Sequence, residues 1–196
     1  MKIISRWDEQ KVLWEDDQET VRKSLVAAVA AKADLAGAML VGAYLVRTYL
    51  ERANLIGANL VLADLGRVKL AGAILVGANL IGVNLAEADL TGANLVGTKL
   101  IGADLEQAIL AGVNLVGANL AGADLTGADF TGANLVGTNL AGAILVGANL
   151  MGANLTAADL VGTNLTGTDL TGADFRGAYL GGTGPADGSP EQGGAR

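Results

Sequence analysis

The chain has 196 residues, a formal net charge of −7, and neither cysteine nor histidine. The missing histidine excludes Ser-His-Asp and Cys-His catalysis as well as histidine-based metal sites. The missing cysteine excludes a disulfide framework.

The first 32 residues are expected to form a small cap. Residues 2–6 and 12–14 predict two short strands around a turn near Asp8 and Glu9. A helix is expected after them, with Asp16 or Asp17 as its N-cap, because acids suit the positive end of a helix dipole. The charged start of the chain does not resemble a signal peptide, so a cytoplasmic location is expected.

The predicted helix carries one apolar stripe. Val21, Leu25 and Val29 recur at i, i+4 and i+8, while its basic residues lie largely off the stripe. A solenoid leaves its first coil exposed unless something covers it, so the hairpin and helix are predicted to cap the repeats that follow. Three basic residues give little support to the alternative of a DNA-binding or membrane-surface helix.

A repeat of five residues fills most of the remaining chain. From Leu35 to Leu180 every fifth residue is leucine, apart from Phe130 and Phe175, so thirty pentads share one phase. A period of five fits neither a helix nor a simple strand, so it describes a repeating turn of the backbone.

The typical pentad is Ala-Asx-Leu-x-Gly, as in residues 118–122. In a short extended piece the alanine and leucine point inward together while the Asx points outward, and the next two positions turn a corner. Glycine fills the second corner position in 23 of the 30 pentads. We therefore expect positive φ or close backbone approach at that position.

This pattern resembles the pentapeptide repeat family, whose motif is a small residue, Asn or Asp, Leu or Phe, any residue, and Gly. The resemblance covers residues 33–182 and implies an all-β solenoid, a right-handed quadrilateral β-helix of about seven coils with four pentads in each. The expected organisation is a cap over residues 1–32, the β-helix over 33–182, and a disordered Gly/Pro-rich tail over 183–196.

High hydrophobicity does not predict a membrane span here. Hydrophobic residues make up 51% of the chain, the mean hydropathy is +0.42, and residues 131–158 carry no charge. Asparagines recur at five-residue spacing through this window, which would place polar groups on every side of a helix. The hydrophobicity is instead attributed to the core of a narrow solenoid.

With four pentads in a coil, residues twenty apart stack in columns. Two columns of first corner residues are aliphatic, and such contiguous apolar surface is rarely left in water. They are candidate contact faces for self-association or for an unknown protein partner, and they consist of Ile56, Val76, Val96, Val116 and Val136 on one face and Val41, Val61, Ile81 and Ile101 on the next. The alternative is that these ladders stabilise the corners by stacking on themselves.

Acidic residues gather on the other two faces. The candidate acidic faces hold Asp64, Glu87, Asp104, Glu106 and Asp124 on one side and Asp89, Asp129 and Asp169 on the next. Between residues 70 and 175 there are nine acids and one base, Lys99. Direct nucleic-acid binding is disfavoured, because phosphate contacts need a basic surface.

The resemblance adds one specific alternative. Some family members that confer quinolone resistance are thought to imitate duplex DNA in gyrase, which implies a DNA-mimicking inhibitor or protector of DNA gyrase. The repeat has no projecting loop, two faces are apolar, and the net charge of −7 is moderate for imitating phosphates. Solubility of an apolar rod is the simpler reason for the acids.

The sequence therefore predicts a non-enzymatic structural or protein-interaction rod with no catalytic residue, cofactor or metal. Its partner is unknown, and gyrase is a partner only under the alternative. Asp104 and Asp124 are stacked neighbours at about the 5 Å separation of a retaining glycosidase pair. They lie on a convex surface without a pocket, so catalysis is not expected.

Overall fold

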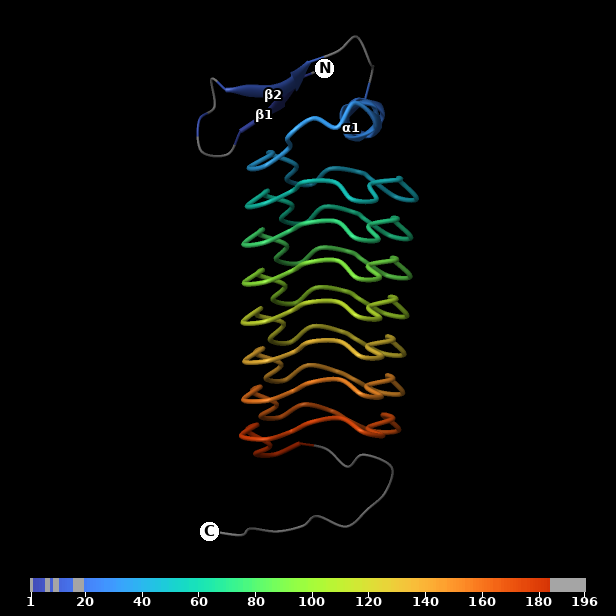
Figure 1. The fold of residues 1–196 in the computed structure, drawn as a ribbon, viewed down its shortest axis with the longest axis vertical. Coiled ribbons are helices and arrows are strands. Elements are labelled where there is room, and N and C mark those ends of the chain that lie inside the picture. The colour runs from blue at the N-terminus through green and yellow to red at the C-terminus, as the bar shows by residue number, and fades with distance from the viewer. Residues whose placement is uncertain (1, 6–7, 9–10, 16–19, 184–196) are drawn as a thin grey trace.

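The computed structural model describes residues 2–5, 8, 11–15 and 20–183. Strands β1 (Lys2–Ile4) and β2 (Val12–Glu15) form an antiparallel hairpin, and helix α1 (Val21–Ala30) follows them. The hairpin and α1 lie at one end of a stack of flat coils (Figure 1). Both predicted strands and the helix are present, although Arg6 and Glu9 lie outside the described residues.

Helix α1 begins later than predicted. Its N-cap is Thr20, whose Oγ1 accepts the backbone N–H of Lys23 at 3.3 Å, and the first turn contains no acid. The prediction of Asp16 or Asp17 as the N-cap was wrong, and both residues lie outside the described part of the chain. A threonine hydroxyl caps a helix as a carboxylate does, and at Thr20 it places the start of the helix directly before the apolar stripe.

The apolar stripe of α1 covers the first coil as predicted. Leu25 is fully buried, and Val21 and Val29 are partly buried against the same core. Ile3 of β1 joins this core with 2% of its surface exposed. The cap therefore removes from water the apolar end that the solenoid would otherwise present.

The repeats stack with a period of twenty residues. Parallel bridges join each outward residue to the one twenty positions later, from Met39 with Asn59 to Asp159 with Tyr179. Since a pentad has five residues, a coil holds four of them, which gives the quadrilateral β-helix that the sequence predicts. The coil count, the handedness and the exact domain boundaries stay predictions.

Every backbone N–H in a regular pentad has an acceptor, as residues 118–122 illustrate. The alanine donates across the preceding corner, the asparagine donates to the preceding coil, and the leucine and glycine donate to the following coil. The remaining donor is the first corner residue, Ala121. Its N–H is accepted by Oδ1 of Asn119 at 3.1 Å. The motif is thus a complete hydrogen-bonding unit, which a narrow solenoid needs because its backbone is packed on both sides.

The core consists of the leucine and alanine columns. Their side chains are almost entirely buried through the middle of the rod, and Phe130 takes a leucine position with 0% exposure. Threonines that replace the alanine also turn inward, and Thr138 donates its hydroxyl to the carbonyl of Leu115 at 2.9 Å. Among the described residues the hydroxyl of Thr48 alone is buried without an acceptor or donor.

The second corner position has positive φ in all thirty pentads, with values from 55° to 72°. A Cβ added at Gly112 would meet nothing within 4 Å, so glycine is favoured there by its conformational freedom and not by lack of space. The corners without glycine are Arg47, Arg52, Leu62, Arg67, Glu87, Gln107 and Ala157. Each of these residues has a left-handed conformation that costs roughly 1 kcal/mol.

The predicted tail over residues 183–196 lies outside the described residues except for Thr183, whose N–H bonds to the carbonyl of Leu180 at 3.3 Å.

Candidate interaction surfaces

The outward Asx residues stabilise the corners. Oδ1 of Asp104 accepts the N–H of Glu106 at 3.0 Å, and Oδ1 of Asp124 accepts both the N–H and the hydroxyl of Thr126 at 3.0 and 2.6 Å. These are Asx turns, in which a side chain bonds to the backbone two residues later. The sequence interpretation placed these side chains outward but missed this contact, although an Asx two residues before the first corner residue is its signal.

Asparagine forms the same turn as aspartate, as Asn119 shows with Ala121. The corner therefore needs an acceptor oxygen and not a negative charge. Where the sequence has aspartate in place of asparagine, the charge is an added property of the surface.

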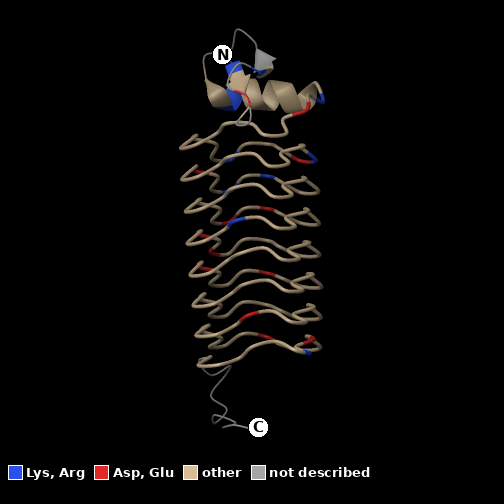
Figure 2. Ribbon diagram, turned by 90° about the vertical axis from the view of Figure 1, so that its left-hand side faces the viewer, with Lys and Arg blue, Asp and Glu red and all other residues tan. Residues whose placement is uncertain are grey.

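The acidic faces occupy two adjacent sides of the rod, as predicted. Bridges place Asp64, Asp104 and Asp124 in one column, while Asp89, Asp129 and Asp169 lie in another. Glu87 and Glu106 lie at corners beside the first of these columns. Figure 2 shows acids along the length of the coils, whereas the bases lie mainly near the capped end.

Two of the predicted acids are paired with bases. Glu87 accepts from Nη2 and Nε of Arg67 at 2.6 and 2.9 Å, and Asp89 lies 3.4 Å from Nζ of Lys69. Within the described part of the chain no ion pair is formed by the acids farther along the two faces, which are Asp104, Glu106, Asp124, Asp129 and Asp169. Beyond Asp89, more than three coils from the cap, the negative charge of these two faces is thus uncompensated.

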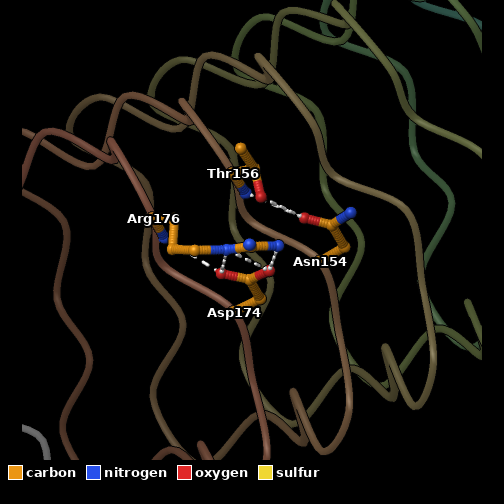
Figure 3. A network of polar contacts seen from close by, with 4 residues as sticks. All are labelled: Asn154, Thr156, Asp174 and Arg176. Carbon is orange, nitrogen blue, oxygen red and sulfur yellow. Dashed lines mark hydrogen bonds and ion pairs between the residues drawn. The ribbon is translucent and has the colours of Figure 1, made fainter.

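A further ion pair lies near the distal end of the rod. Figure 3 shows Asp174 and Arg176 stacked on Asn154 and Thr156, one coil apart. Nη2 of Arg176 donates to Oδ2 of Asp174 at 2.6 Å, while Thr156 donates its hydroxyl to Asn154 at 2.6 Å. The two corners use the same Asx turn, once neutral and once charged.

The stability of the fold is expected to decrease when the pH falls below about 4. Hydrogen bonds from Arg67, Thr171 and Arg176 hold the pKa values of Glu87, Asp169 and Asp174 below their ordinary values. Because these folded pKa values are depressed, their stabilisation is complete above the unfolded pKa of about 4 and is lost as the pH falls through the folded values.

Urea denaturation at a series of pH values measures this dependence. The midpoint is expected to be level from neutral pH down to about pH 5 and to fall below about pH 4. Asp174→Asn keeps an acceptor for the corner and should flatten the fall. A midpoint that rises on acidification would contradict the expected sign.

The two aliphatic columns lie at successive corners and flank one side of the rod. Between them lies a column of outward residues that are mostly asparagines, which we call the amide column. It contains Asn59, Asn79, Lys99, Asn119 and Asn139. The aliphatic side chains are mostly half-buried by their stacked neighbours, but Val41, Ile56 and Ile101 remain 52%, 38% and 39% exposed. The surface is therefore two apolar ridges separated by amides, and not one continuous apolar sheet. We call the two ridges and the amide column between them the ridged face.

Leu62 is an interaction candidate that the sequence interpretation missed. It lies on the ridged side, is 68% exposed, and has a φ of 55° at a corner where glycine is usual. Its Cδ2 extends over the next coil, where it would lie 2.9 Å from a Cβ added at Gly82. A leucine in place of a corner glycine was the available signal, because the fold gains nothing from this strained and exposed side chain.

The described residues contain no group of three side chains able to hold a metal ion. Asp104 and Asp124 are bridged neighbours as predicted, and each uses one carboxylate oxygen in its own Asx turn. Over the same residues, no helix has the length and apolar character needed to cross a membrane. The cytoplasmic location stays a prediction.

Comparison with known proteins identifies the repeat. The family model for pentapeptide repeats matches at residues 31–67, 63–100, 98–135, 133–172 and 148–183. A pentapeptide repeat protein of known structure from the cyanobacterium Cyanothece 51142 is 35% identical over 57% of this chain and 90% of its own, with a TM-score of 0.49.

Two other solved structures are similar over longer segments. HetL, a pentapeptide repeat protein of Nostoc sp. involved in heterocyst differentiation regulation, is 29% identical over 85% of this chain and 95% of its own, with a TM-score of 0.38. QnrB1, a plasmid-mediated fluoroquinolone resistance protein, is 16% identical over 72% of this chain and 78% of its own, with a TM-score of 0.39. No curated protein matches the sequence significantly.

Proposed function

Because the chain belongs to the pentapeptide repeat family, we propose that it is a non-enzymatic interaction rod that binds proteins through its ridged face. Ridge side chains that stack on one another hold a fixed spacing, so the face is rigid before it meets a partner. Rigid apolar surface binds at low entropic cost.

The distribution of charge carries this proposal. The chain has 20 acidic residues, yet between residues 41 and 139 the ridged face contains a single charged residue, Lys99, and its amide column reaches an acid only at Asp159. Depletion of charge together with aliphatic side chains is typical of the centre of a protein contact. The amides between the ridges offer donors and acceptors at a regular spacing of about 4.8 Å.

Charged substitutions in one ridge test the proposal. Val96→Glu combined with Val116→Glu places two carboxylates one strand spacing apart in the middle of the ridge. We expect a lower assembly mass in light scattering, or weaker capture of a partner, because burying these charges in a contact is costly.

A matched pair of substitutions controls for the added charge and for the change of side chain at the first corner position. Ala86→Glu with Thr126→Glu adds the same charge at the first corner position of the face that already carries Glu106. These variants should leave mass and capture unchanged. Equal losses in both pairs, or no loss in either, would remove the ridged face as a contact surface.

Leu62→Gly separates binding from folding on the same side of the rod. Glycine suits a φ of 55°, so the midpoint of unfolding should be unchanged or higher. Association should weaken, because a side chain that is 68% exposed is lost from the contact. A stable variant that associates as well as the parent would exclude Leu62 as an anchor.

The alternative function is DNA mimicry towards gyrase, which the unpaired acids of the distal rod support. It predicts inhibition of gyrase supercoiling by the purified protein. Inhibition should weaken when Asp104, Asp124 and Asp129 become asparagine, since asparagine keeps the Asx turns and removes only the charge. An absence of inhibition at micromolar protein would exclude this function.

A further inference from the structure

A groove separates the first turn of α1 from the first coils. Its upper part has a volume of 840 Å³ and is lined by Met39, Val41 and Tyr44, with Arg22 and Lys23 at the rim. Arg22 and Tyr44 also line an adjoining hollow of 540 Å³, which continues along the rod past Arg47 and Arg67. We call these two connected hollows the proximal groove.

The proximal groove is basic although the chain is acidic. Its upper part is lined by two bases and no acid. The lower part contains two acids, and both are already engaged by neighbours. Asp64 accepts from the N–H of Gly66 at 3.2 Å and from the amide of Asn84 at 3.0 Å, while Glu87 is paired with Arg67. The pair of Arg67 with Glu87 is neutral as a whole, so Arg22, Lys23 and Arg47 outnumber Asp64 and the net charge of the groove is positive.

Arg47 is the arginine of the groove that the fold does not explain. Arg47 and Arg67 stand one coil apart at second corner positions with φ values of 55° and 57°, where glycine is the residue without strain. Arg67 is paired with Glu87, the next residue of the column, and Gln107 follows before glycine occupies the position at Gly127. Among the described residues no ion pair accounts for Arg47, and a strained side chain without such a partner is a mark of function.

The floor of the groove is apolar and open to solvent. Met39, Val41 and Tyr44 are 36%, 52% and 66% exposed, and they lie on the first coil beneath α1. A ligand that fills the groove must therefore offer an apolar side chain to the floor and negative groups to Arg22 and Arg47. Guanidinium groups bind carboxylates with two parallel hydrogen bonds, which adds direction to the charge.

A polyanion does not fit the surroundings of the groove. Nucleic acid would extend beyond it onto the rod, where Asp89, Asp104 and Glu106 would repel phosphates. A membrane surface is flat, whereas the apolar residues here lie in a hollow, and the apolar stripe of α1 is buried against the coils. A short peptide segment is the ligand class that combines limited length, carboxylates and an apolar side chain.

We propose that the proximal groove binds an extended acidic segment of a partner protein, with an apolar side chain on Met39, Val41 and Tyr44 and carboxylates on Arg22 and Arg47. The groove shares Val41 with the end of one ridge, but the variants that test it leave both ridges intact.

Fluorescence anisotropy with a defined probe tests the proposal. The probe is a short fluorescein-labelled peptide of aspartate, glutamate and leucine, and the comparison peptide has asparagine and glutamine in place of the acids. We expect saturable binding of the acidic peptide only. Arg47→Gly should weaken it by about tenfold or more, as expected for the loss of charge-assisted hydrogen bonds. Arg67 is left in place because its removal would release Glu87 into the groove.

The variant should fold normally, because glycine relieves the positive φ at this corner. Arg52→Gly is the matched control. Arg52 also has positive φ, at 59°, and it lines a different hollow at the C-terminal end of α1. The control removes the same charge and the same strain, so peptide affinity should change by less than about twofold.

The apolar part of the site has its own test. Tyr44→Ala should weaken the leucine-containing peptide but not an acidic peptide without leucine. Four results would overturn the proposal: no saturable binding, equal binding of the amide peptide, equal losses in the matched control, or tighter arginine-dependent binding of phosphatidylserine vesicles or of an oligonucleotide than of the peptide.

Discussion

Leu115→Ala is expected to lower the free energy of unfolding by about 2–5 kcal/mol, as large core truncations do. Leu115 is fully buried, and it stacks between Leu95 and Leu135, which are also fully buried. The backbone on either side cannot move in to fill the cavity. Leu95 donates to Asn114 at 2.7 Å and Leu115 donates to Asn134 at 2.8 Å, so both neighbouring coils are fixed by hydrogen bonds.

Urea or guanidinium denaturation followed by circular dichroism measures this loss. Leu62→Ala is the control, since it deletes the same atoms from a side chain that is 68% exposed. That substitution should change stability by less than about 0.5 kcal/mol. Similar losses in the two variants would mean that the leucine column is not the main source of stability.

Deletion of Gly117 is expected to prevent formation of one continuous rod. Removing one residue shifts every later pentad by one position, so leucines of the next coil would leave the core and outward amides would enter it. Exposing four leucines costs about 1.5–3 kcal/mol each, or roughly 6–12 kcal/mol in total. A local rearrangement of one corner cannot offset this loss of stability.

Deletion of residues 101–120 is the matched control, although it removes far more of the chain. Residues twenty apart occupy the same column, so Leu100 is then followed by Ala121 in the correct phase. This variant should fold as a rod one coil shorter, with a smaller denaturant dependence of unfolding because less surface is exposed. The measurement compares the stability of the two deletion variants. If the loss of Gly117 alone were tolerated better than the loss of the whole coil, corner geometry would not set the phase.

The sequence predicted the repeat because its information is local and repeated. The leucine at every fifth position and the glycine at the second corner each follow from the needs of a single pentad, and thirty copies make the period unmistakable. The columns followed from this period together with the four pentads per coil that the resemblance to pentapeptide repeats implies, and the bridges between Asp104 and Asp124 and between Asn59 and Asn79 confirm them.

Other features depend on side chains whose partners are not set by the period. The N-cap at Thr20 was missed because it ends a run of six polar residues, 15–20, in which Asp16 and Asp17 are equally good N-cap types. The role of Asn119 in its own corner was missed because outward direction was equated with freedom from contact. The predicted apolar faces proved to be ridges around an amide column, since the residues between two corners were not considered.

The sequence by itself determined a four-sided rod with a buried leucine column, and it determined which outward residues share a column. The buried leucine column follows from a period that each pentad enforces through its own corner and its own hydrogen bonds, whereas the four sides and the columns also rest on the resemblance to pentapeptide repeats. Only the tertiary structure decided how exposed those columns are, which acids are paired, and that α1 and the first coils enclose a basic groove around Arg22, Arg47 and Arg67. The physical reason is that burial and charge pairing depend on neighbouring coils and on the cap, and thus on contacts between residues that are distant along the chain.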